Sequence, residues 1–548
     1  MKRLLTMFIP MLIGTAAPTW ACTNLLAGKK ASADGATMIS YSADSYCLYG
    51  ELYHWPPALY PEGAMLDIYE WDTGRRLGQI PQARQTFNVV GNMNEHQLCI
   101  GETTFGGRPE LRDTTGLLDY GSLIYIALQR CRTAREAIRT ITGLMQTYGY
   151  YSSGESFSIA DPNEVWVLEA IGKGAGRKGA VWVAARIPDD CISAHANQAR
   201  IRHFVPDDND CFLYSEDVIA FAREKGYFAG NDRDFSFADA YAPLDFEAQR
   251  FCEARVWSFF RRFCAGAEAW MPYAMGNAGE PLPFCVRPNR PLTLRDMMLA
   301  MRDHYEGSPM DPTLDAGAGA FHAPVRFAPL RWESDSAEYF FERPIATQQT
   351  GFSFVGQMRS HLPDEVGGVL WFGVDDATFT VYSPMYACMT QTPECFRAGN
   401  GNLTTFSWTS AFWIHNWVAQ MAYARYNQIV VDTRTMQDKL ENTLIDRQPA
   451  IEAQAIRRLN DDRRQAVAFL TEYSMQQAQH AFAEWKSLGE MLLVKYMDGV
   501  VKRQDDAGNF ERTEYGRPSY PHRPPYDDEW RRRIATETGK KLKIIPNK

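Results

Sequence analysis

Short apolar runs separated by polar turns dominate the chain from residue 22 onwards. Residues 23–28 and 37–42 form one such pair, and residues 86–91 and 97–102 form another. Runs of this length, bounded by polar turn residues, predict β-strands joined in hairpins.

Two longer runs, residues 164–171 and 180–187, are almost continuously apolar. Such runs are typical of strands in a sheet that is covered on both faces. A G-x-G-x-x-G match at residues 174–179 joins the two runs directly, with no helix after it. A dinucleotide site requires that helix, so we interpret the glycines as a hairpin connection.

The segment from residue 120 to residue 148 has helical character. Its second half opens with Thr133 and Glu136 at capping-box spacing, and Gly149 stands where the helix can end. This pattern predicts a helix that ends near residue 148.

The second half of the chain changes character. A further helical zone starts near residue 246, and strand-like segments return at residues 367–372 and 378–382. Residues 411–497 are rich in Ala, Gln, Leu, Met and Glu, which predicts long helices. Residues 501–548 are charged and interrupted by prolines, as is typical of a solvated tail.

The N-terminus has the pattern of a secretory signal peptide. Lys2 and Arg3 precede a mostly apolar stretch over residues 4–13, and small residues dominate from there to Ala21. This order of charged, apolar and small residues predicts cleavage before Cys22 and export to the periplasm or the extracellular space.

Composition and charge exclude some classes of function. The chain has 548 residues, of which 45% are hydrophobic, as in folded globular proteins. Its net charge of −9 argues against nucleic acid as a partner. No later stretch approaches about 18 uninterrupted apolar residues, so no stable membrane insertion is expected. His195 and His203 have no second ligand cluster at matching spacing, so neither a metal nor a cofactor is expected.

Eleven cysteines agree with an oxidising compartment. Cys388 and Cys395, separated by a polar loop, are the pair that we expect to form a short-range disulfide. The connectivity of the others stays open, and several thiols can be free and buried.

Cys22 stands out because it directly follows the predicted cleavage site. Once freed, its thiol (pKa about 8.5) and α-amine (about 8) are closely matched. The amine can accept the thiol proton, and the thiolate can attack a carbonyl and form a thioester. The alternative is a lipoprotein cysteine, but Thr19 occupies the position where that signal usually has leucine.

Seven motifs then follow one another in order, from Cys22 to about residue 432. They are residues 22–35 (CTNLLAGKKASADG), 42–45 (SADS), 94–96 (NEH), 101–107 (GETTFGG), 192–200 (ISAHANQAR), 303–307 (DHYEG) and 362–373 (LPDEVGGVLWFG). Together they resemble the dipeptidase A and secernin family of cysteine peptidases. The resemblance implies an α+β, N-terminal nucleophile hydrolase fold, a four-layer αββα sandwich. It also implies metal-free cleavage of dipeptides and very short peptides.

The resemblance also implies roles for single residues. Cys22 would be the nucleophile, Asp44 the carboxylate that orients its amine, Asn197 an oxyanion donor and Arg255 an electrostatic support. The layout is also similar, more distantly, to cholylglycine hydrolases and penicillin acylases. Thr104 falls where those amidases have a second polar donor, usually asparagine. Tyr41 stands where they have an arginine, which argues against a bile-acid-type activity.

We therefore expect an exported cysteine dipeptidase. The expected divisions are a signal peptide (1–21), a catalytic domain (22–410), a helical extension (411–500) and a charged tail (501–548). Two alternatives stay open: an amidase that cleaves a non-peptide acyl-amide on the same fold, and a non-catalytic lipid-anchored binding protein. The expected partner is a dipeptide or short peptide, and homo-oligomer formation is left open.

Overall fold

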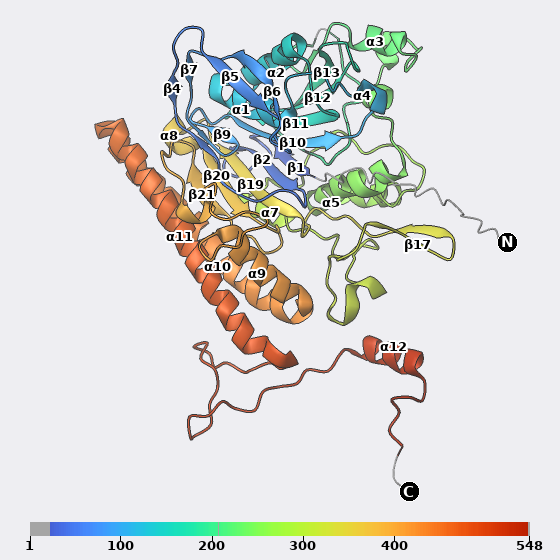
Figure 1. Cartoon of the computed structure of the whole chain (residues 1–548), viewed down its shortest axis with the longest axis vertical. Helices are drawn as coiled ribbons and strands as arrows, with labels where there is room; N and C mark the ends of the chain where they lie inside the picture. Colours follow the sequence, from blue (N-terminus) through green and yellow to red (C-terminus); the bar gives the residue numbers. More distant parts are fainter. Residues whose placement is uncertain (1–21, 207, 546–548) are drawn as a thin grey trace, which may run out of the picture.

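Two antiparallel β-sheets form the centre of the computed structural model, which describes residues 22–206 and 208–545 (Figure 1). The predicted signal peptide lies outside these residues. The seven-stranded sheet has the order β16, β14, β1, β2, β19, β20, β21, with bounds Cys285–Val286, Ile192–His195, Thr23–Ala27, Thr37–Asp44, Thr350–Met358, Val369–Val374 and Ser383–Tyr386. The eight-stranded sheet has the order β15, β13, β12, β11, β10, β9, β8, β3, with bounds Phe212–Tyr214, Ala180–Ile187, Val165–Gly172, Gly154–Ala160, Cys99–Phe105, Met93–Asn94, Val89–Val90 and His54–Trp55.

The two sheets face each other across a shared apolar core. Strand β2 contacts β10, β11 and β12 of the opposite sheet. Leu26 and Ile39 from one sheet belong to the same buried cluster as Val167 and Val183 from the other. Strand β12 is buried along its whole length, as its continuous apolar sequence predicts.

Helices cover the outer face of each sheet, so the chain is α+β, as expected. Helices α1 (Tyr120–Arg130) and α2 (Ala134–Tyr148) contact strands of the eight-stranded sheet. Helices α5 (Ala254–Phe263) and α7 (Leu294–Ala300) contact the seven-stranded sheet. The shorter elements are α3 (Val218–Glu224), α4 (Phe237–Tyr241), α6 (Met271–Ala274) and α8 (Asp364–Gly367), and the two-stranded pairs β4 (Ala58–Leu59) with β7 (Gln85–Thr86), β5 (Met65–Tyr69) with β6 (Arg76–Pro81), and β17 (Arg331–Ser334) with β18 (Ala337–Phe340).

Two local predictions in the first half of the chain are confirmed. The Thr133 side chain accepts a hydrogen bond from the Glu136 amide at the start of α2, and Gly149 ends the helix with a φ of 81°. The glycines at residues 174–179 lie in the connection between β12 and β13, which pair as an antiparallel hairpin.

The long helices predicted for residues 411–497 are present as α9 (Ala411–Ala424), α10 (Tyr426–Asp461) and α11 (Arg463–Tyr496). They pack on β20 and β21 at the outer face of the seven-stranded sheet. After them the chain is largely exposed up to α12 (Asp528–Thr538), which has no buried residue and lies at a distance from the sheets (Figure 1). In the described part of the chain, no helix combines the length and apolar composition needed to cross a bilayer.

The predicted strand at residues 378–382 is wrong. This segment is a loop, and the strand β21 begins only at Ser383. The carbonyl groups of Thr378 and Thr380 accept hydrogen bonds from the Gln437 side chain of α10, at 3.0 and 2.7 Å. A helix side chain thus takes the place of a strand partner.

The predicted Cys388–Cys395 disulfide is also wrong. All eleven cysteines are free thiols. Cys388 packs into the cluster beneath α5 and α7, whereas Cys395 packs into the core between the sheets. The two side chains therefore enter different cores, and burial raises the pKa of each thiol to about 12.

A buried ion pair joins α10 to the seven-stranded sheet. Removing it tests whether the long helices and the sheets unfold as one unit. Arg359, which directly follows β19, donates to both carboxylate oxygens of Glu452, at 2.9 and 2.5 Å. We expect Glu452→Gln to lower the free energy of unfolding by about 3–5 kcal/mol, because it leaves a buried guanidinium without its counter-charge. Urea unfolding followed by circular dichroism and tryptophan fluorescence measures this loss.

The control is Glu537→Gln in the exposed Arg533–Glu537 pair of α12, which should cost less than about 0.5 kcal/mol. Since the helices share buried contacts with the sheet, we expect one transition for both probes. Two separate transitions, with only one shifted by Glu452→Gln, would show that the helices fold as an independent unit.

Candidate active site

Cys22 lies at the point where the two sheets meet. It directly precedes β1, which is paired on one side with β2 and on the other with β14. Its Sγ atom is 3.8 Å from the hydroxyl of Tyr41 on β2 and 3.7 Å from Oε1 of Glu102 on β10. Tyr41 in turn donates a short hydrogen bond of 2.5 Å to Glu102. Side chains from both sheets therefore surround the sulfur, which is almost completely buried.

This environment keeps the Cys22 thiol protonated. Burial raises its pKa well above the ordinary value, and the charges of Glu102 and Asp44 raise it further. Hydrogen bonds from the Asp44 backbone and from Tyr41 act in the opposite direction. A nucleophilic thiolate at this position needs a base that accepts the proton during the reaction.

Arg255 reaches the backbone of Cys22 from helix α5. Its Nη1 donates to the Cys22 carbonyl at 2.6 Å and to the Thr23 hydroxyl at 2.8 Å. Its Nη2 donates to the Asn197 side-chain oxygen at 2.9 Å. Arg255 thus links the start of β1 to the loop that follows β14.

Asn197 and Thr104 are also part of this network. Asn197 Nδ2 donates to the Thr104 carbonyl at 2.8 Å, which leaves its second N–H for another acceptor. The backbone of Asn197 has a φ of 60°, a left-handed conformation that asparagine tolerates better than most residues. The Thr104 hydroxyl donates to Glu155 at 3.0 Å, so its proton is already engaged.

Asp44, at the end of β2, is held by three side chains. Arg343 Nη2 donates to it at 2.7 Å, Thr350 donates at 2.7 Å and Ser42 at 3.2 Å. Burial raises the pKa of the carboxyl group, and the charge of Arg343 lowers it. The five residues expected at the site therefore converge, with Asp44 within electrostatic reach of both Cys22 and Arg255.

The sequence interpretation missed Glu102, Glu155 and Arg343. Glu102 belongs to the motif at residues 101–107, and a glutamate inside a buried strand was a signal that could have identified it. Glu155 lies on β11, diagonal to Glu102 in the strand register. Arg343 is 299 residues away from Asp44 along the chain and follows an exposed hairpin, so no local pattern predicts its contact.

His195 is not placed to act on Cys22. Its Nδ1 lies 2.7 Å from the Thr103 hydroxyl, and its Nε2 lies 2.7 Å from the Ser158 hydroxyl. Burial, with the charges of Arg200 and Arg255, lowers its pKa to about 3, so the ring is neutral near pH 7. Over the described ranges, no three His, Cys, Asp or Glu side chains are grouped in a way that could hold a metal ion.

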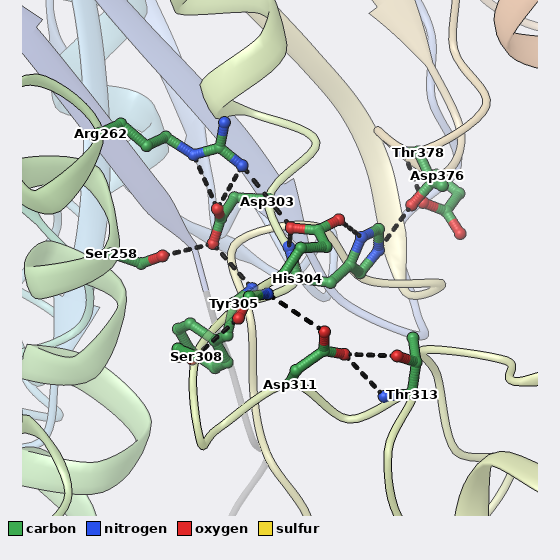
Figure 2. A network of polar contacts seen from close by, with 12 residues as sticks. Ser258, Arg262, Asp303, His304, Tyr305, Ser308, Asp311, Thr313, Asp376 and Thr378 are labelled. Atoms are coloured by element: carbon green, nitrogen blue, oxygen red, sulfur yellow. Dashed lines mark hydrogen bonds and ion pairs between the residues drawn. The ribbon is translucent and has the colours of Figure 1, made fainter.

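The motif at residues 303–307 holds α5 in place (Figure 2). The buried carboxylate of Asp303 accepts hydrogen bonds from Ser258 at 2.5 Å and from Arg262 Nε at 2.7 Å. His304 lies next to it, with Nε2 3.0 Å from the Thr378 hydroxyl. Ser258 and Arg262 are three and seven residues after Arg255, which places all three on one side of the helix. The motif therefore fixes the helix that carries Arg255.

Known peptidases are similar to this chain over most of its length. The sequence profile of peptidase family C69 matches residues 21–55 and 48–439. A protein named "Probable dipeptidase" from Latilactobacillus sakei is 25% identical over 481 residues, which cover 84% of this chain and 92% of that protein. A "Probable dipeptidase" from Salmonella dublin is 26% identical over 388 residues, with 67% and 81% covered. "Dipeptidase A" from Lactobacillus helveticus is 25% identical over 439 residues, with 74% and 82% covered.

The family profile thus spans the motifs from Cys22 to residue 373, and with them every residue of the candidate site. It confirms the resemblance that the sequence motifs indicate. Because the match extends over well more than half of the chain, this protein belongs to peptidase family C69.

Proposed function

We propose that this protein is an exported cysteine-type dipeptidase. Its nucleophile is the thiol of Cys22, freed as the N-terminal residue of the mature chain when residues 1–21 are removed. The observation that carries the proposal is the position of Cys22. The residue that directly follows the predicted signal peptide is also the one whose carbonyl Arg255 binds and whose sulfur lies between the two sheets. The relatives named as dipeptidases support the substrate class.

In the proposed reaction, the α-amine of Cys22 accepts the thiol proton. The thiolate attacks the carbonyl carbon of the scissile peptide bond, and the α-ammonium returns the proton to the leaving amine. A thioester between Cys22 and the first residue of the substrate remains. Water then attacks the thioester, with the amine as base, and releases the first amino acid and the free thiol.

Each neighbouring residue has a role in this scheme. The N–H of Asn197 that Thr104 does not use is available to the oxyanion of the tetrahedral intermediate. Arg255 fixes the Cys22 backbone, and Asp44 orients the amine. The α-amine is the favoured base because His195 has both ring nitrogens engaged by hydroxyl groups.

The arrangement of helices outside two facing sheets supports the four-layer N-terminal nucleophile fold. The division into a catalytic domain up to residue 410 and a helical extension stays a prediction. The amidase alternative stays open. Its bile-acid type has less support, since Tyr41, at the position of the arginine in those amidases, binds Glu102 instead.

Replacing the nucleophile should stop the reaction. We expect Cys22→Ala to abolish hydrolysis of dipeptides, and Cys22→Ser to keep at most about a thousandth of the rate, because a hydroxyl is a far weaker nucleophile than a thiol next to an amine. Release of amino acids from a dipeptide panel measures the rate. Cys388→Ser serves as the control, which should change stability but not turnover. Full activity in Cys22→Ala would place the active site elsewhere.

The free amine is tested by extending the N-terminus. Two forms are compared, one that begins at Cys22 and one that retains a methionine before it, with the mature start established by intact mass. The methionine converts the amine into an amide, which cannot accept the thiol proton. We expect the Cys22-first form to hydrolyse dipeptides and the extended form to be nearly inert. Equal rates would remove the α-amine from the mechanism.

A thiol reagent and a metal chelator distinguish a cysteine mechanism from a metal-dependent one. Iodoacetamide should abolish activity by alkylating Cys22, and dipeptides should slow the alkylation. Activity should persist after dialysis against EDTA, because the proposed steps use no metal. Loss of activity in EDTA that zinc restores would contradict the scheme.

A further inference from the structure

Glu102 and Glu155 form a buried carboxyl pair next to the nucleophile. Their side chains are 1% and 0% exposed. Glu102 faces Cys22 and Tyr41, and Glu155 accepts hydrogen bonds from Thr104 at 3.0 Å and from Tyr150 at 3.3 Å. Their hydrogen-bond partners are thus neutral groups.

The pair differs in this respect from four other buried carboxylates that have an arginine within contact. These are Asp44 with Arg343, Glu253 with Arg200, Glu441 with Arg302 and Glu452 with Arg359. Among the residues that the structure describes, neither Glu102 nor Glu155 takes part in an ion pair. Burying a carboxylate without a counter-charge is costly, so the pair needs an explanation.

If the two carboxyl groups share one proton, only one charge is buried, which lowers the cost. Glu102 Oε2 and Glu155 Oε1 are both buried, and no other group in the described part of the chain donates a hydrogen bond to either atom. Burial raises the pKa of both carboxyl groups, that of Glu155 well above its usual range. Hydrogen bonds with Glu155, Tyr41 and Cys22 act in the opposite direction on Glu102, so Glu102 is the member of the pair that carries the negative charge, close to the sulfur of Cys22.

That charge works against the nucleophile, since it disfavours the thiolate. It becomes favourable once a positive charge enters the site. A dipeptide brings one, because its α-ammonium is bonded to the carbon next to the scissile carbonyl. With that carbonyl about 3–3.5 Å from the sulfur, the ammonium is within reach of a carboxylate oxygen 3.7 Å from the same sulfur.

We propose that Glu102 binds the free α-ammonium of the first residue of the substrate and restricts this site to short peptides with an unblocked N-terminus. This inference rests on the proposed function, and it assigns the group that selects the substrate. The competing cation is the α-ammonium of Cys22 itself, and the experiment below separates the two.

The test compares alanyl-leucine with propionyl-leucine, which differ only in the ammonium group. The mature wild-type enzyme should prefer alanyl-leucine by at least about 100-fold in kcat/KM, because a buried carboxylate stays unpaired with the other substrate. Glu102→Gln should lower kcat/KM for alanyl-leucine by about 10- to 100-fold, mainly through KM. The kcat/KM of Glu102→Gln for propionyl-leucine should stay within about threefold of the wild-type value, so the preference for alanyl-leucine disappears.

Glu155→Gln is the matched control. It replaces a neutral carboxyl group by a neutral amide of the same shape and leaves the charge on Glu102, so the preference for alanyl-leucine should persist. Equal losses on both substrates in Glu102→Gln would overturn the proposal, because Glu102 would then act on Cys22 or its amine. Loss of the preference in Glu155→Gln alone would overturn it as well.

A binding measurement separates this inference from the proposed function. The rate at which iodoacetamide alkylates Cys22 is measured in the wild type with alaninamide or with propionamide present. Protection by alaninamide alone, absent in Glu102→Gln, supports an ammonium site even in a protein that hydrolyses no dipeptide. Equal effects of the two amides on the wild type would overturn the inference without any variant, whatever the enzyme hydrolyses.

Discussion

The guanidinium of Arg255 is the group on which the geometry of the site depends. All five of its N–H donors are used: they bind the carbonyls of Phe251, Cys22 and Ala196, the Thr23 hydroxyl and the Asn197 side chain. One planar group thus joins α5, the start of β1 and the loop after β14. A lysine has three donors on one atom and could not span these acceptors, so the exchange would not be conservative at this position. The contacts to neutral oxygens offset part of the desolvation of this buried cation.

Outside the site, arginine side chains likewise join separate elements, here by pairing with carboxylates. Arg302 binds Glu441 of α10, and Arg359 binds Glu452 of the same helix. Apolar contacts alone leave the position of a long helix along a sheet loosely determined, whereas bidentate pairs fix it. Glu441 also accepts from the Tyr382 amide, so α10 and the loop before β21 are held in one register. The Glu102–Glu155 pair lacks such a cation and lies against the sulfur of Cys22, and these two observations together underlie the ligand that we propose for it.

Local patterns predicted the parts of the fold that local interactions decide. The apolar run of β12, the Thr133 cap and the hairpin glycines were all recognisable, because each depends on neighbours in sequence. The loop at residues 378–382 was not, since its backbone groups are satisfied by a helix about sixty residues later along the chain. Within the site, the place of Cys22 after the predicted signal peptide and the family resemblance led us to expect Cys22, Asp44, Asn197, Arg255 and Thr104, which the structure brings together. The contact of Arg343 with Asp44 could not be predicted from the sequence, because it depends on tertiary structure alone.

The distances along the chain between the site residues have a consequence for folding. Arg255 meets Cys22 across 233 residues, and Arg343 meets Asp44 across 299. Contacts of such high sequence separation have the largest loop-closure cost and form late. The central strand β1 also needs both β2 and β14 beside it before Cys22 is held in place. During synthesis and early folding, Cys22 therefore lacks the contacts that surround it in the folded protein. The arrangement that the proposed reaction requires exists only when both sheets are complete, so partly folded chains cannot use it.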